Sequence, residues 1–174
     1  MINPAQPIGP MPEPGAYDPD AIQDSIARIA NLPARVRELV TEASPSQLSG
    51  TYRPGSWTAT QIIHHLADSH LNSLCRFKLA LTENHPTIRP YDQDAWVLLG
   101  DTGPQQLATT LQLLEGLHGR WVALLRSLAP EQWHRTFHHP ENDQDFVLHH
   151  LVHVYAWHGD HHLAQANHSI TTSR

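Results

Sequence analysis

Several features that define large protein classes are missing from this chain. Its 174 residues include one cysteine, Cys75, so no internal disulfide can form, and a reducing cytoplasm is the expected location. No apolar run approaches the roughly 18–20 residues that a membrane-spanning helix needs, and the first residues lack the basic and apolar regions of a signal peptide. The sequence also has no G-x-S-x-G, P-loop or Rossmann motif, so nothing supports a serine hydrolase or a nucleotide-binding protein.

Positive charge is scarce as well. Eleven Lys and Arg residues stand against 17 Asp and Glu, which gives a formal net charge of −6, and the basic residues form no run. We therefore expect neither nucleic acid nor a membrane as a partner. Histidine, in contrast, is abundant with 15 residues, and a hydrophobic fraction of 40% is sufficient for the core of one soluble globular domain.

The spacing of apolar residues predicts an all-α protein. Residues 1–16 are rich in proline and are interpreted as an extended N-terminal arm, and residues 17–170 as a single domain. Pro33 is expected to interrupt the first helix, and strand-like alternation is absent. Apolar side chains recur at helical spacing in four long segments, at about residues 18–40, 58–84, 104–130 and 145–167. Four such helices indicate a helical bundle.

Two connections of this bundle carry further signals. Thr58 is followed three residues later by Gln61, which is the capping-box arrangement that starts a helix. Residues 85–103 form a long connection with room for one helical turn at about residues 91–99, and residues 130–144 are expected to be irregular. Connections as long as the first of these are often functional in compact domains.

The segment of residues 157–165 carries the strongest functional signal. It holds His158 and His162 at positions i and i+4, which lie on one face of a helix about 5–6 Å apart. Two imidazoles in this arrangement can bind one divalent cation. The pair continues the apolar stripe of Leu151 and Tyr155 and is expected to face the core, where an unsatisfied polar group costs on the order of 1–3 kcal/mol. A metal would satisfy both rings, and so would hydrogen bonds to neighbouring side chains or water.

A catalytic zinc or nickel site needs about three protein ligands and one open position. The third candidate lies on the second helix, in a segment that contains several histidines, but the periodicity does not single one out. Ile63 and Ala67 mark the most apolar side of that helix, and His65 lies opposite them on a polar stripe. This stripe is interpreted either as a solvated helix face or as one wall of a polar cavity inside the bundle.

Several separated segments resemble, in the same order, the DinB/YfiT-like superfamily and within it the YfiT-like metal-dependent hydrolases. The matching segments are Gly55-Ser56-Trp57-Thr58, Ile63-His64-His65-Leu66-Ala67-Asp68-Ser69-His70, Pro86-Thr87-Ile88-Arg89-Pro90-Tyr91-Asp92, Leu114-Glu115-Gly116-Leu117-His118 and Trp157 through His162. The resemblance implies an antiparallel four-helix bundle, a homodimer and a metal held between the second and fourth helices. It also implies the three ligands: His65, which directly precedes Leu-Ala-Asp, together with His158 and His162.

Four further residues are candidates for catalysis. Asp68 and Asn72 lie on the polar stripe of the second helix, where they either orient a ligand or water or belong to a solvated face. His118 interrupts an apolar stripe, where it is interpreted either as an acid or base or as an ordinary core histidine. Tyr155 either donates a hydrogen bond at the site or packs in the core. Arg76 suits a substrate carboxylate or a surface ion pair.

Three neutral imidazoles leave a cation its full charge, which favours activation of water at neutral pH. We therefore predict a metal-dependent hydrolase of a small molecule with one divalent ion per chain, Zn²⁺ before Ni²⁺. The resemblance to DinB-type thiol S-transferases gives an alternative, the conjugation of a low-molecular-weight thiol such as bacillithiol to an electrophile, and this chemistry needs no general base. A third hypothesis is a non-catalytic metal-binding protein, although a closed structural site would require a fourth protein ligand.

Overall fold

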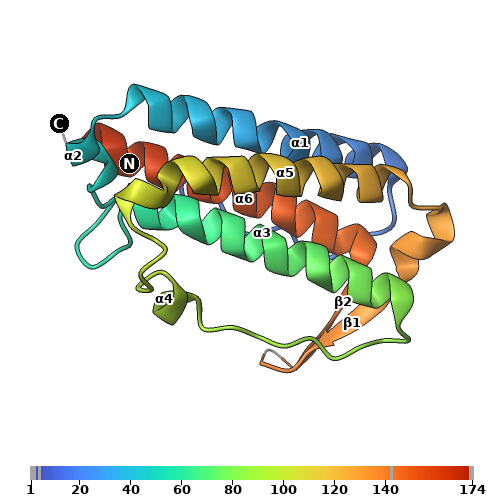
Figure 1. Ribbon diagram of the computed structural model, residues 1–174. Helices are drawn as coiled ribbons and strands as arrows, with labels where there is room; N and C mark the ends of the chain where they lie inside the picture. The colour runs from blue at the N-terminus through green and yellow to red at the C-terminus, as the bar shows by residue number, and fades with distance from the viewer. Residues whose placement is uncertain (1–2, 4, 142, 173–174) are drawn as a thin grey trace.

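Four long helices form the body of the protein. The computed structural model describes residues 3, 5–141 and 143–172, so the predicted arm of residues 1–16 lies partly outside the described residues. The prediction of a four-helix bundle is confirmed (Figure 1). Its helices are α1 (Pro19–Glu42), α3 (Ala59–Thr82), α5 (Leu107–Arg126) and α6 (Leu148–Thr172).

Each long helix packs against two others. Helix α1 contacts α5 and α6, and α3 contacts the same two helices. Figure 1 shows that α1 and α6 run in one direction and that α3 and α5 run in the other. The antiparallel arrangement therefore holds for α3 with α6 and for α1 with α5. Because α3 and α5 are parallel, the connection between them returns along the length of the bundle, and it carries the one-turn helix α4 (Gln93–Trp96) within the predicted turn.

The starts of the helices follow local sequence signals. Thr58 caps α3 as predicted: its hydroxyl accepts from the Gln61 N–H at 3.2 Å, and the Gln61 amide oxygen accepts from the Thr58 N–H at 3.0 Å. A second capping box at Ser44 starts the short helix α2 (Pro45–Leu48). Pro104 opens a 3-10 turn, η1 (Pro104–Gln106), that leads into α5.

Pro33 does not interrupt α1, contrary to the prediction. The helix continues from Pro19 to Glu42, and Leu32 and Val36 on either side of the proline are buried in the core. Burial of this apolar face outweighs the cost of the proline, which removes one backbone hydrogen bond from the helix interior. The carbonyl that loses this bond belongs to Ile29, four residues earlier.

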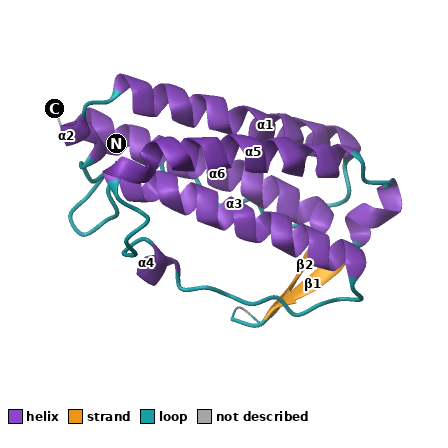
Figure 2. Cartoon of the chain, in the orientation of Figure 1, coloured by secondary structure: helices purple, strands orange, loops and turns teal. Residues whose placement is uncertain are grey.

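A small hairpin stands where irregular chain was expected. After the 3-10 turn η2 (Pro130–His134), strand β1 (Thr136–His139) pairs antiparallel with β2 (Gln144–Val147), and α6 begins only at Leu148. The register pairs Phe137 with Phe146, whose rings stack at 5.5 Å, and Phe137 is fully buried. Figure 2 shows the hairpin at one end of the bundle, where β1 also bonds to the connection that follows α3.

The described part of the N-terminal arm lies beside α6. The Gln165 side-chain amide donates to the Ala5 carbonyl at 3.4 Å, Ile8 lies in a groove with Leu163, and Met11 reaches the cavity beside His158. Among the described residues, no helix is long and apolar enough to cross a membrane.

Candidate metal centre

The three histidines proposed as ligands meet between α3 and α6. His65 of α3 and His158 and His162 of α6 each place a ring nitrogen within 4.8 Å of the other two. The Nε2 atoms of His65 and His158 are 3.3 Å apart, and the ring centroids of His158 and His162 are 4.4 Å apart. These separations allow three imidazole nitrogens to converge on one cation.

The fold explains how these rings come together. His158 and His162 are one turn apart on α6, so they share the face that packs on α3. His65 is only 2% exposed, whereas His158 and His162 are partly exposed. The polar stripe of α3 is therefore an inner wall of the bundle at His65, and the cluster is deep on the α3 side and open on the α6 side.

Burial keeps the cluster neutral. Loss of solvation lowers the pKa of His65 to about 4, and it lowers the pKa of His158 and of His162 well below the usual value. The neighbouring histidines depress the pKa of His158 and His162 further, because a second positive charge so close would be repelled. Neutral rings offer lone pairs, which is the form that a metal requires.

The Nδ1 atoms of His162 and His158 have partners outside the cluster, whereas Nε2 of His158 faces His65 Nε2 and, at 3.5 Å, the Ser69 hydroxyl. His162 Nδ1 lies 2.9 Å from the Gln165 side-chain oxygen, which only accepts, so Nδ1 carries the proton and Nε2 keeps its lone pair. His158 Nδ1 lies 3.2 Å from Nε2 of His70, on the side away from the cluster. A set of three neutral imidazoles, two of them with a hydrogen-bonded Nδ1, fits a divalent ion such as Zn²⁺ or Ni²⁺.

A cavity of about 830 Å³ adjoins the cluster at His158. Its walls include Arg76, Tyr91 and Tyr155, and Arg76 Nη1 donates to the Tyr155 hydroxyl at 3.2 Å. Burial raises the pKa of Tyr91 to about 12, against the opposing effect of a hydrogen bond with Ser69, so this phenol stays protonated. The cavity therefore presents the Arg76 guanidinium, the protonated Tyr91 phenol and the Tyr155 hydroxyl beside the histidines, and its wall also carries the carboxylates of Asp92, Asp94 and Glu141.

The four catalytic candidates do not all lie at the same cavity. Tyr155 lines the cavity, and its ring centroid lies 5.6 Å from that of His158. Asp68 and Asn72 do not line the described walls of this cavity; the Asn72 amide donates to the backbone carbonyl of Asp68 at 2.9 Å. Burial, and then the charge of Asp101, raise the pKa of Asp68 to about 6. His118 is buried behind the cluster, with its Nε2 3.0 Å from His70.

Sequence reasoning missed several neighbours of the cluster. The Trp57 ring lies 4.7 Å from His65, and its indole nitrogen donates to Asp94 at 3.1 Å, so it covers one side of the cluster. His70 is completely buried and touches His158. The signal for His70 was present, because it lies seven residues after Ile63 on the apolar stripe of α3, where a polar side chain needs a partner.

Known proteins of one family are similar to this chain over most of its length. The family model of the DinB superfamily matches residues 28–166. A protein of Bacillus subtilis (strain 168) named "Putative metal-dependent hydrolase YfiT" is 42% identical over 163 residues, which are 94% of this chain and 92% of that protein. "Putative metal-dependent hydrolase OB0782" of Oceanobacillus iheyensis is also 42% identical over 163 residues, with 94% of each chain covered.

A solved structure supports the same relationship. It is described as "YfiT from Bacillus subtilis is a probable metal-dependent hydrolase with an unusual four-helix bundle topology". It matches with a TM-score of 0.91 and 41% identity and covers 99% of this chain and 96% of its own.

Proposed function

The chain belongs to the DinB superfamily, and from this membership and the histidine cluster we propose that it is a metal-dependent hydrolase with a single divalent ion on His65, His158 and His162. The observation that carries the proposal is the convergence of three neutral ring nitrogens within 4.8 Å of one another beside a cavity. Held by these three histidines, such an ion would supply Lewis-acid polarisation of the scissile group and would acidify water, whose pKa comparable sites lower to about 7.

The protein's own groups would orient the substrate. Arg76 is the cation of the cavity wall, and its bond to Tyr155 holds the guanidinium in place for a carboxylate or another anionic group. Because Tyr155 accepts this bond through its oxygen, its own proton stays available for donation to a substrate oxygen near His158. The Trp57 ring packs against His65 and His162. We infer a small substrate that bears a carboxylate for Arg76, and the carboxylates of Asp92, Asp94 and Glu141 in the same wall favour a zwitterion.

The proposal also covers the identity of the metal, the oligomeric state and the cellular location. Three imidazoles accept several divalent ions, and we place Zn²⁺ first and Ni²⁺ second because nitrogen ligands with an open position suit both. Family membership supports a homodimer, which light scattering at micromolar concentration tests. The exposed free thiol of Cys75 suits a reducing compartment such as the cytoplasm.

Thiol S-transfer is the second candidate for the same site. Among the described residues, no carboxylate forms a hydrogen bond with His65, His158 or His162, so a general base for water is not evident in direct contact with the ligands. A thiol that coordinates the ion is deprotonated without a base. Arg76 would then hold the carboxylate of a low-molecular-weight thiol.

Metal analysis with a matched control tests the proposal. The wild-type protein, His158→Ala and His168→Ala are each stripped with a chelator, reloaded with Zn²⁺ and desalted, and metal per chain is counted. We expect about one ion in the wild type and in His168→Ala, which changes a histidine of the same helix outside the cluster, and none in His158→Ala. Reloaded wild-type protein without bound metal would overturn the proposal.

The two chemistries are then separated on the loaded protein. Hydrolysis is measured on a panel of small carboxylate-bearing esters and amides. Thiol consumption is measured when a thiol is added to the same panel. Hydrolysis that requires the ion and needs no thiol supports the hydrolase. Turnover only in the presence of a thiol would replace it with the transferase.

A further inference from the structure

His158 and two buried histidines, His70 and His118, form a continuous hydrogen-bonded row behind the candidate metal centre. His158 Nδ1 lies 3.2 Å from His70 Nε2, and His70 Nδ1 lies 3.0 Å from His118 Nε2. The row ends where His118 Nδ1 meets the backbone carbonyl of Ile29 at 2.7 Å. His70 is 0% and His118 2% exposed, so water does not replace these partners. The row crosses the bundle from α6 through α3 and α5 to α1.

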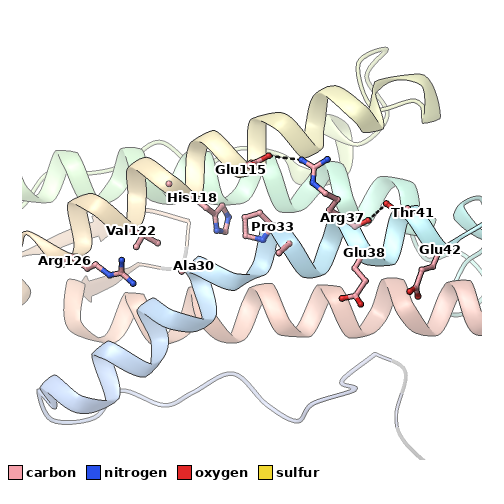
Figure 3. A pocket seen from close by; sticks show the side chains of 12 residues that line it. Ala30, Pro33, Arg37, Glu38, Thr41, Glu42, Glu115, His118, Val122 and Arg126 are labelled. Atoms are coloured by element: carbon pink, nitrogen blue, oxygen red, sulfur yellow. Dashed lines mark hydrogen bonds and ion pairs between the residues drawn. The ribbon is translucent and has the colours of Figure 1, made fainter.

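The far end of the row depends on Pro33. A carbonyl in a helix normally accepts from the N–H four residues later, and for Ile29 that residue is Pro33, which has no N–H. The Ile29 carbonyl is therefore available to a side chain from outside α1, and His118 takes this place. Figure 3 shows His118 of α5 and Pro33 of α1 at the same pocket of about 700 Å³ between the two helices.

The carbonyl dictates where every proton in the row lies. Because a carbonyl only accepts, His118 must donate from Nδ1, and its neutral ring then accepts at Nε2. His70 must therefore donate from Nδ1 and accept at Nε2, and His158 must in turn donate from Nδ1. Burial supports neutral rings, because it lowers the pKa of His118 and, more strongly, that of His70 and His158. The order of donors and acceptors leaves the lone pair of His158 on Nε2.

We propose that Pro33, His118 and His70 are positioning residues that lock His158 in its Nδ1–H tautomer and aim its Nε2 lone pair at the other two ligand rings. The purpose of this row rests on the proposed metal function, but the proton order is a property of the metal-free protein and is tested separately. Mutation of the hydrogen-bond partner of a metal-bound histidine typically lowers metal affinity by 10–100-fold. Here the outer partner of the ligand is itself oriented by a second histidine and a proline-freed carbonyl.

Nitrogen NMR of the metal-free wild-type protein tests the proton order directly. Two-bond correlations in ¹⁵N-histidine-labelled protein at pH 7.5 distinguish a protonated Nδ1 from a protonated Nε2 in each ring. We expect Nδ1–H in His118, His70 and His158. A proton on Nε2 of His70 would reverse the row and overturn the proposal, whether or not the protein binds metal.

Zinc affinity of variants tests the consequence. We expect His70→Phe to raise the Zn²⁺ dissociation constant 10–100-fold, and His118→Phe to raise it less, because His118 acts through His70. His118→Gln should restore most of the affinity, since its amide can donate to a carbonyl and accept from a ring nitrogen. The matched control is His64→Phe, which also removes a buried histidine of α3, bonded to Thr110 at 2.8 Å and to the Gly103 carbonyl at 3.1 Å, but outside the row.

The outcomes separate this proposal from the function on which it rests. Unchanged zinc affinity in folded His70→Phe, or an equal loss in His64→Phe, would refute the positioning role even if the protein is a hydrolase. If His70→Phe does not fold, the tautomers of the wild type and the affinity of His118→Gln against His118→Phe decide the question. Wild-type protein that binds no zinc but shows the expected tautomers would refute the metal function and leave the row intact.

Discussion

Mild acid is expected to destabilise the metal-free protein steeply. His65, His70, His158 and His162 are held neutral in the folded state, because burial depresses the pKa of each ring. In the unfolded chain these rings take up protons near pH 6.5. The unfolded state therefore binds more protons than the folded state below this pH, so the free energy of unfolding falls as the pH falls. Asp68 opposes the effect, because its pKa is raised to about 6 and the folded state gains its proton first.

The magnitude follows from proton linkage. Between pH 7 and 5.5, a histidine that stays neutral when folded and titrates near 6.5 when unfolded loses about 1.2 kcal/mol of stabilisation. The four rings together lose about 5 kcal/mol, and Asp68 returns less than about 1 kcal/mol because it is only half-buried and screened by water. These five groups together give a decrease of about 4 kcal/mol, to which other histidines with a lowered pKa, such as His118, add in the same direction. This is a large part of the 5–15 kcal/mol that typically stabilises a domain.

Urea unfolding followed by circular dichroism, with excess chelator at pH 7 and at pH 5.5, measures this decrease. Two variants test the sign of the individual contributions. Asp68→Asn should make the decrease larger by up to about 1 kcal/mol, and His65→Phe should make it smaller by about 1 kcal/mol. A wild-type decrease below about 1 kcal/mol would refute the reasoning, because it would mean that the buried rings are protonated in the folded state.

Further predictions concern close packing and the cavity. A side chain at Gly159 would place its Cβ 2.7 Å from Leu32 Cδ2, so Gly159→Ala should lower the free energy of unfolding by about 1 kcal/mol. Gly116 has open space around it, so Gly116→Ala should raise the free energy of unfolding by about 1 kcal/mol. Urea unfolding measures both changes, and shifts of both variants in one direction would contradict this prediction. Arg76→Met should raise KM for an anionic substrate at least tenfold while zinc content stays at the wild-type value; an unchanged KM would remove Arg76 from substrate binding. Tyr155→Phe keeps the ring against the cluster and removes its proton, so kcat should fall by about 100-fold with zinc affinity unchanged, and a variant with normal kcat would show that the hydroxyl takes no part in the reaction.

The elements that could be predicted are those with local causes. The capping box at Thr58 fixes the start of α3 through two bonds within four residues, and the spacing of His158 and His162 alone places both rings on one face of α6. The hairpin could not be predicted in this way, because it depends on the pairing of Phe137 with Phe146 and on the burial of Phe137 against the bundle. Tertiary packing likewise keeps α1 helical through Pro33, where a local rule predicts a break.

His65 shows why the periodicity of the helix does not single out the proposed third ligand. Hydrophobic periodicity divides a helix into one buried face and one solvated face. A helix that borders an internal site has two buried faces, an apolar one toward the core and a polar one toward the site. Ile63 and His65 occupy these opposite faces of α3, and both are almost fully buried. The polar face therefore resembles a solvated surface in sequence, and only the helix packed against it reveals the difference.

The row behind the site extends this argument to residues that no spacing rule can join. His70 and His118 are 48 positions apart, and each sits as a single polar residue on an otherwise apolar stripe. Each stripe, taken alone, predicts only that its histidine needs some partner. The two histidines bond to each other because α3 and α5 pack side by side. The Ile29 carbonyl is available as the last acceptor because Pro33 has no N–H to donate within α1. Pro33, which costs α1 a backbone hydrogen bond, thus supplies the fixed end of the row that orients the proposed ligand His158 on another helix.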